Sequence, residues 1–154
     1  MAQRRKKPSA EDTLRRAMAL DRRSKEAQAI PLYQEAIRLG LGRASLRRAM
    51  IFLGSSLTTV GKFAEAVGQL QTAMKRFPND PLVELFLGLA YCAEGRGLDA
   101  AGVLANTLLR ESNNSDVVSF RRWMQRRYAK FTSGRSQQLR RRRVGLSRRG
   151  GLGS

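Results

Sequence analysis

The chain has 154 residues, of which 42% are hydrophobic, and it carries a formal net charge of +18. This length fits about one domain with a buried core. The sequence has no histidine, which removes the commonest general base and metal ligand, and its single cysteine, Cys92, excludes an intramolecular disulfide.

The positive charge is concentrated at the two ends of the chain. Residues 10–116 hold 14 bases and all 12 acids, whereas residues 1–9 hold four bases and no acid. Residues 117–132 add five bases and residues 133–154 add seven, again without an acid. An Arg- and Gly-rich end has too few apolar residues to fold. We therefore expect a nearly neutral folded middle, a basic disordered arm at 1–9 and a basic disordered tail at 132–154.

No segment has the character of a membrane span or of a secretory leader. The basic start leads into no apolar core, and no apolar run approaches the ~20 residues that cross a bilayer. A lone cysteine also fits a reducing compartment. We expect a cytoplasmic protein.

Helical periodicity dominates the rest of the chain, and Val, Ile and Thr are too sparse to favour a sheet. In "PNDPLVEL", Asp80 can cap the following helix and Pro81 can occupy its first position. Gly61 and Gly95 each stand where a helix ends in a left-handed residue. The sequence predicts an all-α protein with helices at roughly 11–22, 25–38, 43–60, 62–77, 81–94, 97–110 and 116–131.

Two segments of the chain repeat with an offset of 34 residues. Residues 47–80 align with residues 81–114, and the matched pairs are Leu53 and Leu87, Gly54 and Gly88, Leu57 and Tyr91, Gly61 and Gly95, Ala66 and Ala100, and Leu70 and Leu104. A glycine at 54 or 88 lets two helices approach closely, and the leucines fill the space between them. Because a helix pair of this kind leaves an apolar face uncovered, the copies must stack.

An earlier and more divergent copy precedes these two. Residues 25–39 align with residues 62–76 at an offset of 37, and the extra residues fall in "GLGRAS" at 40–45. Its first helix, "DTLRRAMALDRR", has Ala17 at the position of the glycine. The chain therefore contains three helix pairs followed by one more helix.

The 34-residue period, the L-G-x2-Y spacing and the A-x3-F position resemble the tetratricopeptide repeat. With "AIPLYQEAIRLGL", "FLGSSLTTVGKFAEAV" and "FLGLAYCAEGRGLDA", the run from about 11 to 131 is similar to small three-repeat bacterial tetratricopeptide proteins. The resemblance implies a short right-handed α-solenoid that serves as an interaction module. We expect a domain over 10–131, with repeats at about 10–42, 47–80 and 81–114 and a capping helix at 116–131.

The stretch "GSSLTTVGKF" at 54–63 has some features of a phosphate-binding loop. Such a loop requires G-x4-G-K-[ST] between a strand and a helix. Here six residues separate the glycines, Phe63 replaces the hydroxyl residue, and the preceding segment has a helical period. The sequence also shows no metal-ligand cluster and no nucleophile with a partner base. We expect a protein that is not an enzyme and needs no cofactor or metal.

The concave face of the solenoid is the candidate binding groove, since the first helix of each pair lines it. Its residues are Arg48, Ile51, Ser55, Thr58, Leu82, Leu85, Leu89 and Cys92. Tetratricopeptide clamps for a terminal carboxylate place Lys, Arg and Asn there, whereas an apolar groove favours an amphipathic helix. The alternative is that the protein's own last helix, or a second copy in a homodimer, already fills the groove.

The last helix, "DVVSFRRWMQRRYAKF", can be capped by Ser115 or Asp116. One apolar stripe contains Val117, Phe120, Met124, Tyr128 and Phe131, at spacings of three and four residues. This stripe predicts a helix that closes the end of the solenoid, with its basic side exposed. Arginine binds phosphate bidentately, so the basic ends could hold RNA or DNA without reading bases. The candidate phosphate-binding residues are Arg122, Arg126, Arg127, Lys130, Arg140, Arg141, Arg142, Arg143, Arg148 and Arg149.

Two functions from different classes follow from the sequence. The first is a non-enzymatic adaptor that binds a peptide or protein partner through the apolar concave groove. The second is a nucleic-acid-associated accessory protein, whose repeats form a scaffold and whose basic ends hold RNA or DNA. We favour the adaptor, because the repeats cover most of the chain and the charge lies at its margins.

Overall fold

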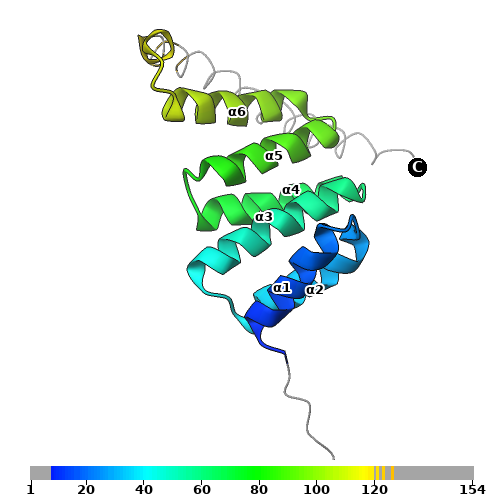
Figure 1. Ribbon diagram of the computed structural model, residues 1–154. Coiled ribbons are helices and arrows are strands. Elements are labelled where there is room, and N and C mark those ends of the chain that lie inside the picture. Colours follow the sequence, from blue (N-terminus) through cyan, green and yellow to red (C-terminus); the bar gives the residue numbers. More distant parts are fainter. Residues whose placement is uncertain (1–7, 120, 122, 124–125, 127–154) are drawn as a thin grey trace, which may run out of the picture.

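The computed structural model describes residues 8–119, 121, 123 and 126, and within them it contains helices and no strand. Six helices follow one another along the chain (Figure 1): α1 (Ala10–Asp21), α2 (Glu26–Leu39), α3 (Arg43–Thr59), α4 (Phe63–Arg76), α5 (Pro81–Ala93) and α6 (Gly97–Glu111). Each of their ends lies within one residue of its predicted position. The all-α prediction is therefore confirmed.

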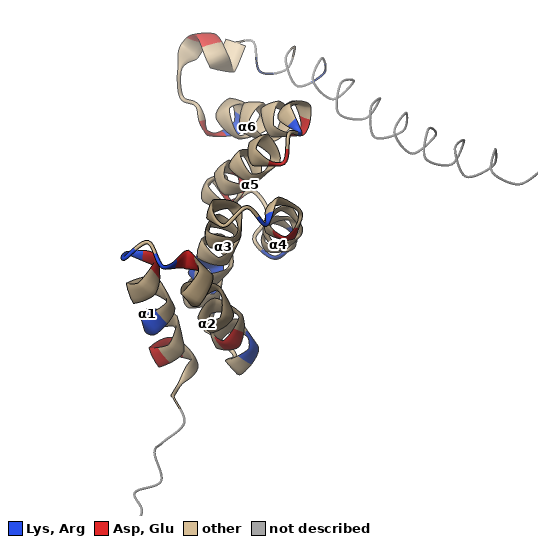
Figure 2. Ribbon diagram, turned by 90° about the vertical axis from the view of Figure 1, so that its right-hand side faces the viewer, with Lys and Arg blue, Asp and Glu red and all other residues tan. Residues whose placement is uncertain are grey.

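The helices stack as three pairs in a row, which is the architecture of an α-solenoid (Figures 1 and 2). Consecutive helices contact each other throughout, from α1 with α2 to α5 with α6. The first helices of the pairs also contact one another, because α3 lies against both α1 and α5. The first helices therefore form one continuous side of the stack.

The predicted close approach within a pair is confirmed at both glycines. A methyl group added at Gly54 would lie 2.7 Å from Leu70 Cδ1, and one added at Gly88 would lie 2.7 Å from Leu104 Cδ2. Both distances are far shorter than ordinary van der Waals contact. The glycines thus allow α3 to seat the Leu70 side chain of α4, and α5 to seat Leu104 of α6.

The turns between helices follow the predicted chemistry with one exception. Gly61 and Gly95 have φ angles of 80° and 77°, the left-handed region that glycine adopts without strain. Asp80 caps α5 by accepting from the backbone N–H groups of Leu82 and Val83, at 3.1 and 3.2 Å. The helix after α6 is capped by Asn114, whose Oδ1 accepts from Asp116 N at 3.0 Å. The prediction of Ser115 or Asp116 as this cap is therefore wrong.

A polar network joins the first and second pairs inside an otherwise apolar core. The fully buried Tyr33 of α2 donates through its hydroxyl to Asp21 Oδ2 at 2.8 Å, and Ser56 Oγ of α3 donates to Asp21 Oδ1 at 2.8 Å. Burial and the bond to Asp21 raise the pKa of the Tyr33 phenol above its usual range. One carboxylate thus connects three helices, and the Tyr33 hydroxyl and Ser56 find their hydrogen bonds there.

Helical character continues after α6, from residue 115 through 119 and at 121, 123 and 126. The rest of the predicted capping helix, up to residue 131, lies outside the described residues. No helix among those described combines the length and apolar character needed to cross a bilayer.

Candidate functional site

Three leucines stand exposed in a row on α5, where the sequence places the concave face. Leu82, Leu85 and Leu89 are 38%, 42% and 48% exposed, and Cys92 continues their line one turn later. Their spacing of three, four and three residues puts them on one side of the helix. We call these four residues the α5 strip. The same helix carries a single charged residue, Glu84, so the strip is apolar along its length.

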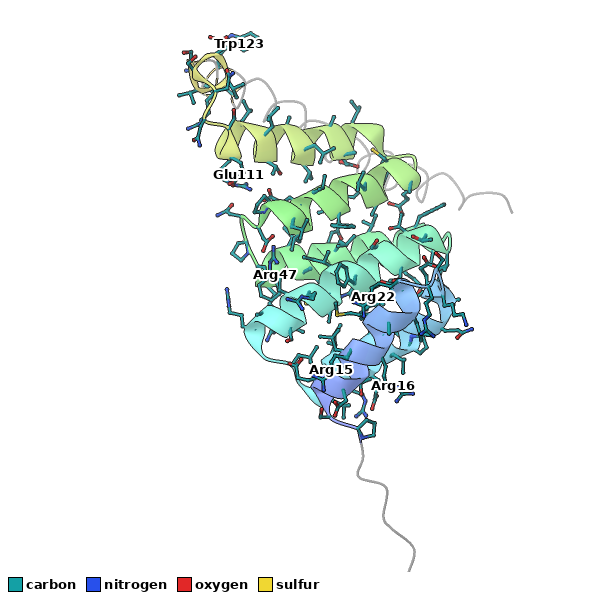
Figure 3. All side chains as sticks on the ribbon, viewed as in Figure 1. Arg15, Arg16, Arg22, Arg47, Glu111 and Trp123 are labelled. Carbon is teal, nitrogen blue, oxygen red and sulfur yellow. The ribbon has the colours of Figure 1, made fainter. Side chains whose placement is uncertain are left out.

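The start of α5 is held firmly against α3. Asp80 caps α5 and also forms an ion pair with Arg47, whose Nη2 lies 2.8 Å from Asp80 Oδ1 (Figure 3 labels Arg47 on α3). The hydrogen bond from Arg47 holds the pKa of the Asp80 carboxyl below its usual range. The first turn of α5 therefore has a fixed place relative to the preceding pair.

The end of α5 is held by Tyr91. Gln71 Nε2 of α4 donates to the Tyr91 hydroxyl at 2.8 Å. The Arg96 guanidinium lies over the Tyr91 ring, 4.3 Å from its centroid, and forms ion pairs with Glu94 and Asp99. With both ends of the helix positioned by neighbours, the α5 strip is a preorganised surface.

Glu84 has a structural role that the sequence pattern did not indicate. It is buried, and its carboxylate accepts from Thr107 Oγ1 at 2.6 Å and from Arg110 Nη2 at 2.6 Å. The bond from Arg110 to Glu84 is the main cause of a raised Arg110 pKa. These bonds join α5 to α6 on the side of α5 away from the strip. The signal in the sequence was a carboxylate at the position where the preceding repeat has Met50, which is buried.

The α3 residues predicted to line the groove divide into two groups. Arg48 is exposed, and Ser55 and Thr58 are half-buried, with Thr58 Oγ1 donating to the Gly54 carbonyl at 2.9 Å. The assignment of Ile51 to the groove is wrong, because its side chain is only 1% exposed. It packs in a cluster with Val83 of α5, since α5 covers this part of α3.

The candidate phosphate-binding residues fall almost entirely outside the described part of the chain. Arg126 lies within it and is exposed. The predicted residues outside the described ranges are Arg122, Arg127, Lys130, Arg140, Arg141, Arg142, Arg143, Arg148 and Arg149. Trp123 is 53% exposed and lies at the end of the molecule beyond α6 (Figure 3).

Comparison with known proteins agrees with the architecture. A family model described as "Tetratrico peptide repeat" matches residues 10–130. No curated protein was found to match the chain. The family match covers most of the chain, and the two glycine–leucine contacts recur at the 34-residue period of that repeat. The protein therefore belongs to the tetratricopeptide-repeat family.

Proposed function

We propose that this protein is a non-enzymatic adaptor that binds an amphipathic helix of a partner protein through the α5 strip. Its family generally mediates protein–protein interactions and is generally not enzymatic. The observation that carries the proposal is the row of exposed leucines, Leu82, Leu85 and Leu89, on a helix positioned at both ends.

The α5 strip has the size and spacing that a helical partner requires. Residues 82 to 92 span roughly 15 Å at about 1.5 Å per residue, or about three helical turns. A helix with apolar residues at i, i+3, i+4 and i+7 presents a matching row. Burying three half-exposed leucines contributes about 1 kcal/mol each, because full burial of a leucine contributes about 1.5–3 kcal/mol. The strip alone thus supports a moderate, reversible affinity.

A charged residue on the neighbouring helix α3 would set the orientation of the bound helix. Arg48 is exposed on α3, next to the helix that carries the strip, whereas α5 offers no exposed charge. A bound helix with an acidic residue on the α3 side would face Arg48, which favours one orientation. Charge complementarity of this kind contributes more to specificity than to affinity.

A selection experiment with the purified full-length chain tests the proposal. A library of amphipathic peptides is displayed on phage, and the enriched peptides are titrated by fluorescence anisotropy. We expect Leu85→Glu with Leu89→Glu to weaken binding at least ~30-fold, or about 2 kcal/mol. The matched control is Leu98→Glu with Leu108→Glu on α6, at positions that are 51% and 61% exposed.

The control pair carries the same two substitutions at similarly exposed leucines, so it should leave peptide affinity within about twofold. An equal loss in both variants would show a charge effect and contradict the proposal. Unchanged affinity in the α5 variant, or the absence of any enriched apolar peptide, would also contradict it.

The second candidate function is the binding of nucleic acid by the basic ends of the chain. It is supported by the distribution of charge, because 16 of the 30 Lys and Arg residues lie in segments 1–9 and 117–154, which contain no Asp or Glu. A truncated chain, residues 10–132, separates the two functions. If it keeps the peptide affinity and loses RNA retention, the two activities reside in different segments. If capture of all partners disappears with the ends and with nuclease treatment, the adaptor function fails.

A further inference from the structure

A second apolar row lies on α6, at the end of the stack. Leu98 and Leu108 are 51% and 61% exposed, Ala101 is exposed, and Ala105 is half-buried. We call these four residues the α6 strip. Their spacing is again three, four and three residues.

The repeat explains why two of these positions are apolar. At the 34-residue offset, Ala101 corresponds to Val67 of α4, and Leu108 corresponds to Met74. Val67 is 4% exposed and Met74 is half-buried, because α5 packs against α4. Ala101 and Leu108 therefore lie where the preceding repeat stacks against its neighbour, whereas Leu98 and Ala105 correspond to the exposed Ala64 and to the half-buried Gln71.

The α6 strip reads the same in both directions along the helix. Its order is leucine, alanine, alanine and leucine, at equal distances from its midpoint. If two such helices meet antiparallel, each Leu98 faces Leu108 of the partner subunit, and each Ala101 faces Ala105 of the partner subunit. The small alanines permit close approach at the centre while the leucines fill the flanks. Such self-complementarity is what a two-fold symmetric interface requires.

The near absence of charged residues on α6 also allows two copies to pack against each other there. Between Gly97 and Leu109 the only charged residue is Asp99, and it is paired with Arg96 at 2.8 Å. Elsewhere, two chains that each carry a charge of +18 would repel one another. The α6 strip is thus a neutral, apolar contact surface on a strongly cationic protein.

The opposite end of the stack carries a charge at a position that head-to-tail stacking would have to bury. Arg16 of α1 stands where the later pairs have the buried leucines Leu53 and Leu87, and it is exposed (Figure 3). A charged residue at this position opposes stacking on the α6 strip of another copy. The closed, symmetric arrangement of two α6 strips is therefore favoured over an open chain of copies.

We propose that the protein forms a two-fold symmetric homodimer in which the α6 strips of two copies pack antiparallel. Stable interfaces bury about 1,200–2,000 Å² in total, which is more than the contact between two α6 helices alone supplies. Val118 and Trp123, 44% and 53% exposed, follow α6 in the chain and can widen the contact. The dimer leaves the α5 strip available, so it goes beyond the adaptor function and would make the adaptor bivalent.

Analytical ultracentrifugation of the full-length chain over a range of micromolar concentrations tests the dimer. We expect a dimer that tightens as salt rises toward ~0.5 M, because screening weakens the repulsion between the cationic copies. Leu98→Glu with Leu108→Glu should give a monomer with unchanged circular dichroism. The matched control, Leu85→Glu with Leu89→Glu, should remain dimeric.

Three outcomes would overturn the proposal. A wild-type chain that stays monomeric at every concentration and salt tested would show that a second copy does not occupy the α6 strip. A dimer that survives the α6 substitutions, or one that is lost on the α5 substitutions, would place the interface elsewhere. None of these outcomes depends on finding a peptide ligand, so failure of the dimer and failure of the adaptor function are distinguishable.

Disulfide formation tests the antiparallel register directly. In a Cys92→Ser background, Ala101→Cys and Ala105→Cys are made in separate chains that carry different affinity tags. The two variants are mixed and mildly oxidised. We expect the disulfide that joins an Ala101→Cys chain to an Ala105→Cys chain to form at least ~10-fold faster than a disulfide that joins two identical chains. Faster coupling of Ala101→Cys with itself would indicate a parallel pair and overturn the proposed register.

Discussion

The second and third repeats, residues 47–80 and 81–114, share one internal joint but differ in their surroundings. In both, a glycine of the first helix accommodates a leucine of the second, Gly54 with Leu70 and Gly88 with Leu104. The second repeat lies between two neighbours, and its Leu70 is fully buried. The third repeat lies at the end of the described stack, and Leu104 is only half-buried. The same contact is therefore enclosed in one repeat and at a boundary in the other.

The difference shows that a repeat position acquires its role from what packs against it. Residues of similar size at matched positions differ in exposure, because Met74 of α4 is half-buried and packs against the core, whereas Leu108 of α6 is 61% exposed. A substitution in the enclosed second repeat should therefore lower the free energy of unfolding more than the matched substitution in the third repeat. Two pairs of matched substitutions and one substitution at a helix cap test this expectation.

The largest effect is expected from truncating Leu70 and Leu104, the leucines of the two glycine–leucine contacts. Leu70→Ala should lower the free energy of unfolding by about 3–4 kcal/mol, because it leaves a cavity in a fully buried site. Leu104→Ala should cost about 1–2 kcal/mol, because its half-exposed site buries less apolar surface. Urea denaturation at one fixed protein concentration measures both. Equal losses would show that the end repeat is as enclosed as the central one.

Substitution of the two glycines should give a smaller difference. Gly54→Ala forces a methyl group against Leu70, and overpacking of this kind costs about 1–3 kcal/mol, partly offset by the ~1 kcal/mol better helix propensity of alanine. At Gly88 the half-exposed Leu104 can move aside, so Gly88→Ala should be nearly neutral. A thermal unfolding series with both variants measures the difference. Greater destabilisation at Gly88 than at Gly54 would contradict the comparison.

The smallest effect concerns the cap of α5, which has a counterpart at the start of the helix after α6. Asp80 and Asn114 occupy matched positions, and each accepts from the N–H groups two and three residues later. Asp80 alone adds an ion pair to Arg47. Asp80→Asn keeps a cap and removes the charge, so it should cost about 1 kcal/mol at pH 7.

The cost of Asp80→Asn should depend on pH with a definite sign. The folded-state pKa of Asp80 lies below the unfolded value of about 3.9, owing first to the bond from Arg47. Its contribution is therefore present above about pH 4 and is lost as the pH falls through the folded-state pKa. The difference between wild type and Asp80→Asn, followed by urea denaturation from pH 7 downward, should shrink in that window. A difference that grows on acidification would contradict the assigned role of the ion pair.

Much of this protein could be predicted from its sequence because the determining interactions are local or periodic. Apolar spacing located six helices to within one residue at each end. Gly61 and Gly95, which adopt the left-handed conformation, marked where two helices stop, and Asp80 before Pro81 marked where one starts. The 34-residue offset identified Gly54 and Gly88 as sites of close helix approach, since only a small residue allows it, and the structure shows that Leu70 and Leu104 are the side chains they accommodate.

What the sequence could not decide is which apolar positions face a neighbour. Ile51 and Leu85 occupy the same position in successive repeats, yet Ile51 is 1% exposed and Leu85 is 42% exposed. Ile51 packs in a cluster with a residue of α5, whereas Leu85 remains open. Helical period shows the side of a helix on which a residue lies, but burial depends on whether another helix covers that side. The tertiary stack alone therefore decided which leucines form core and which remain available for a partner.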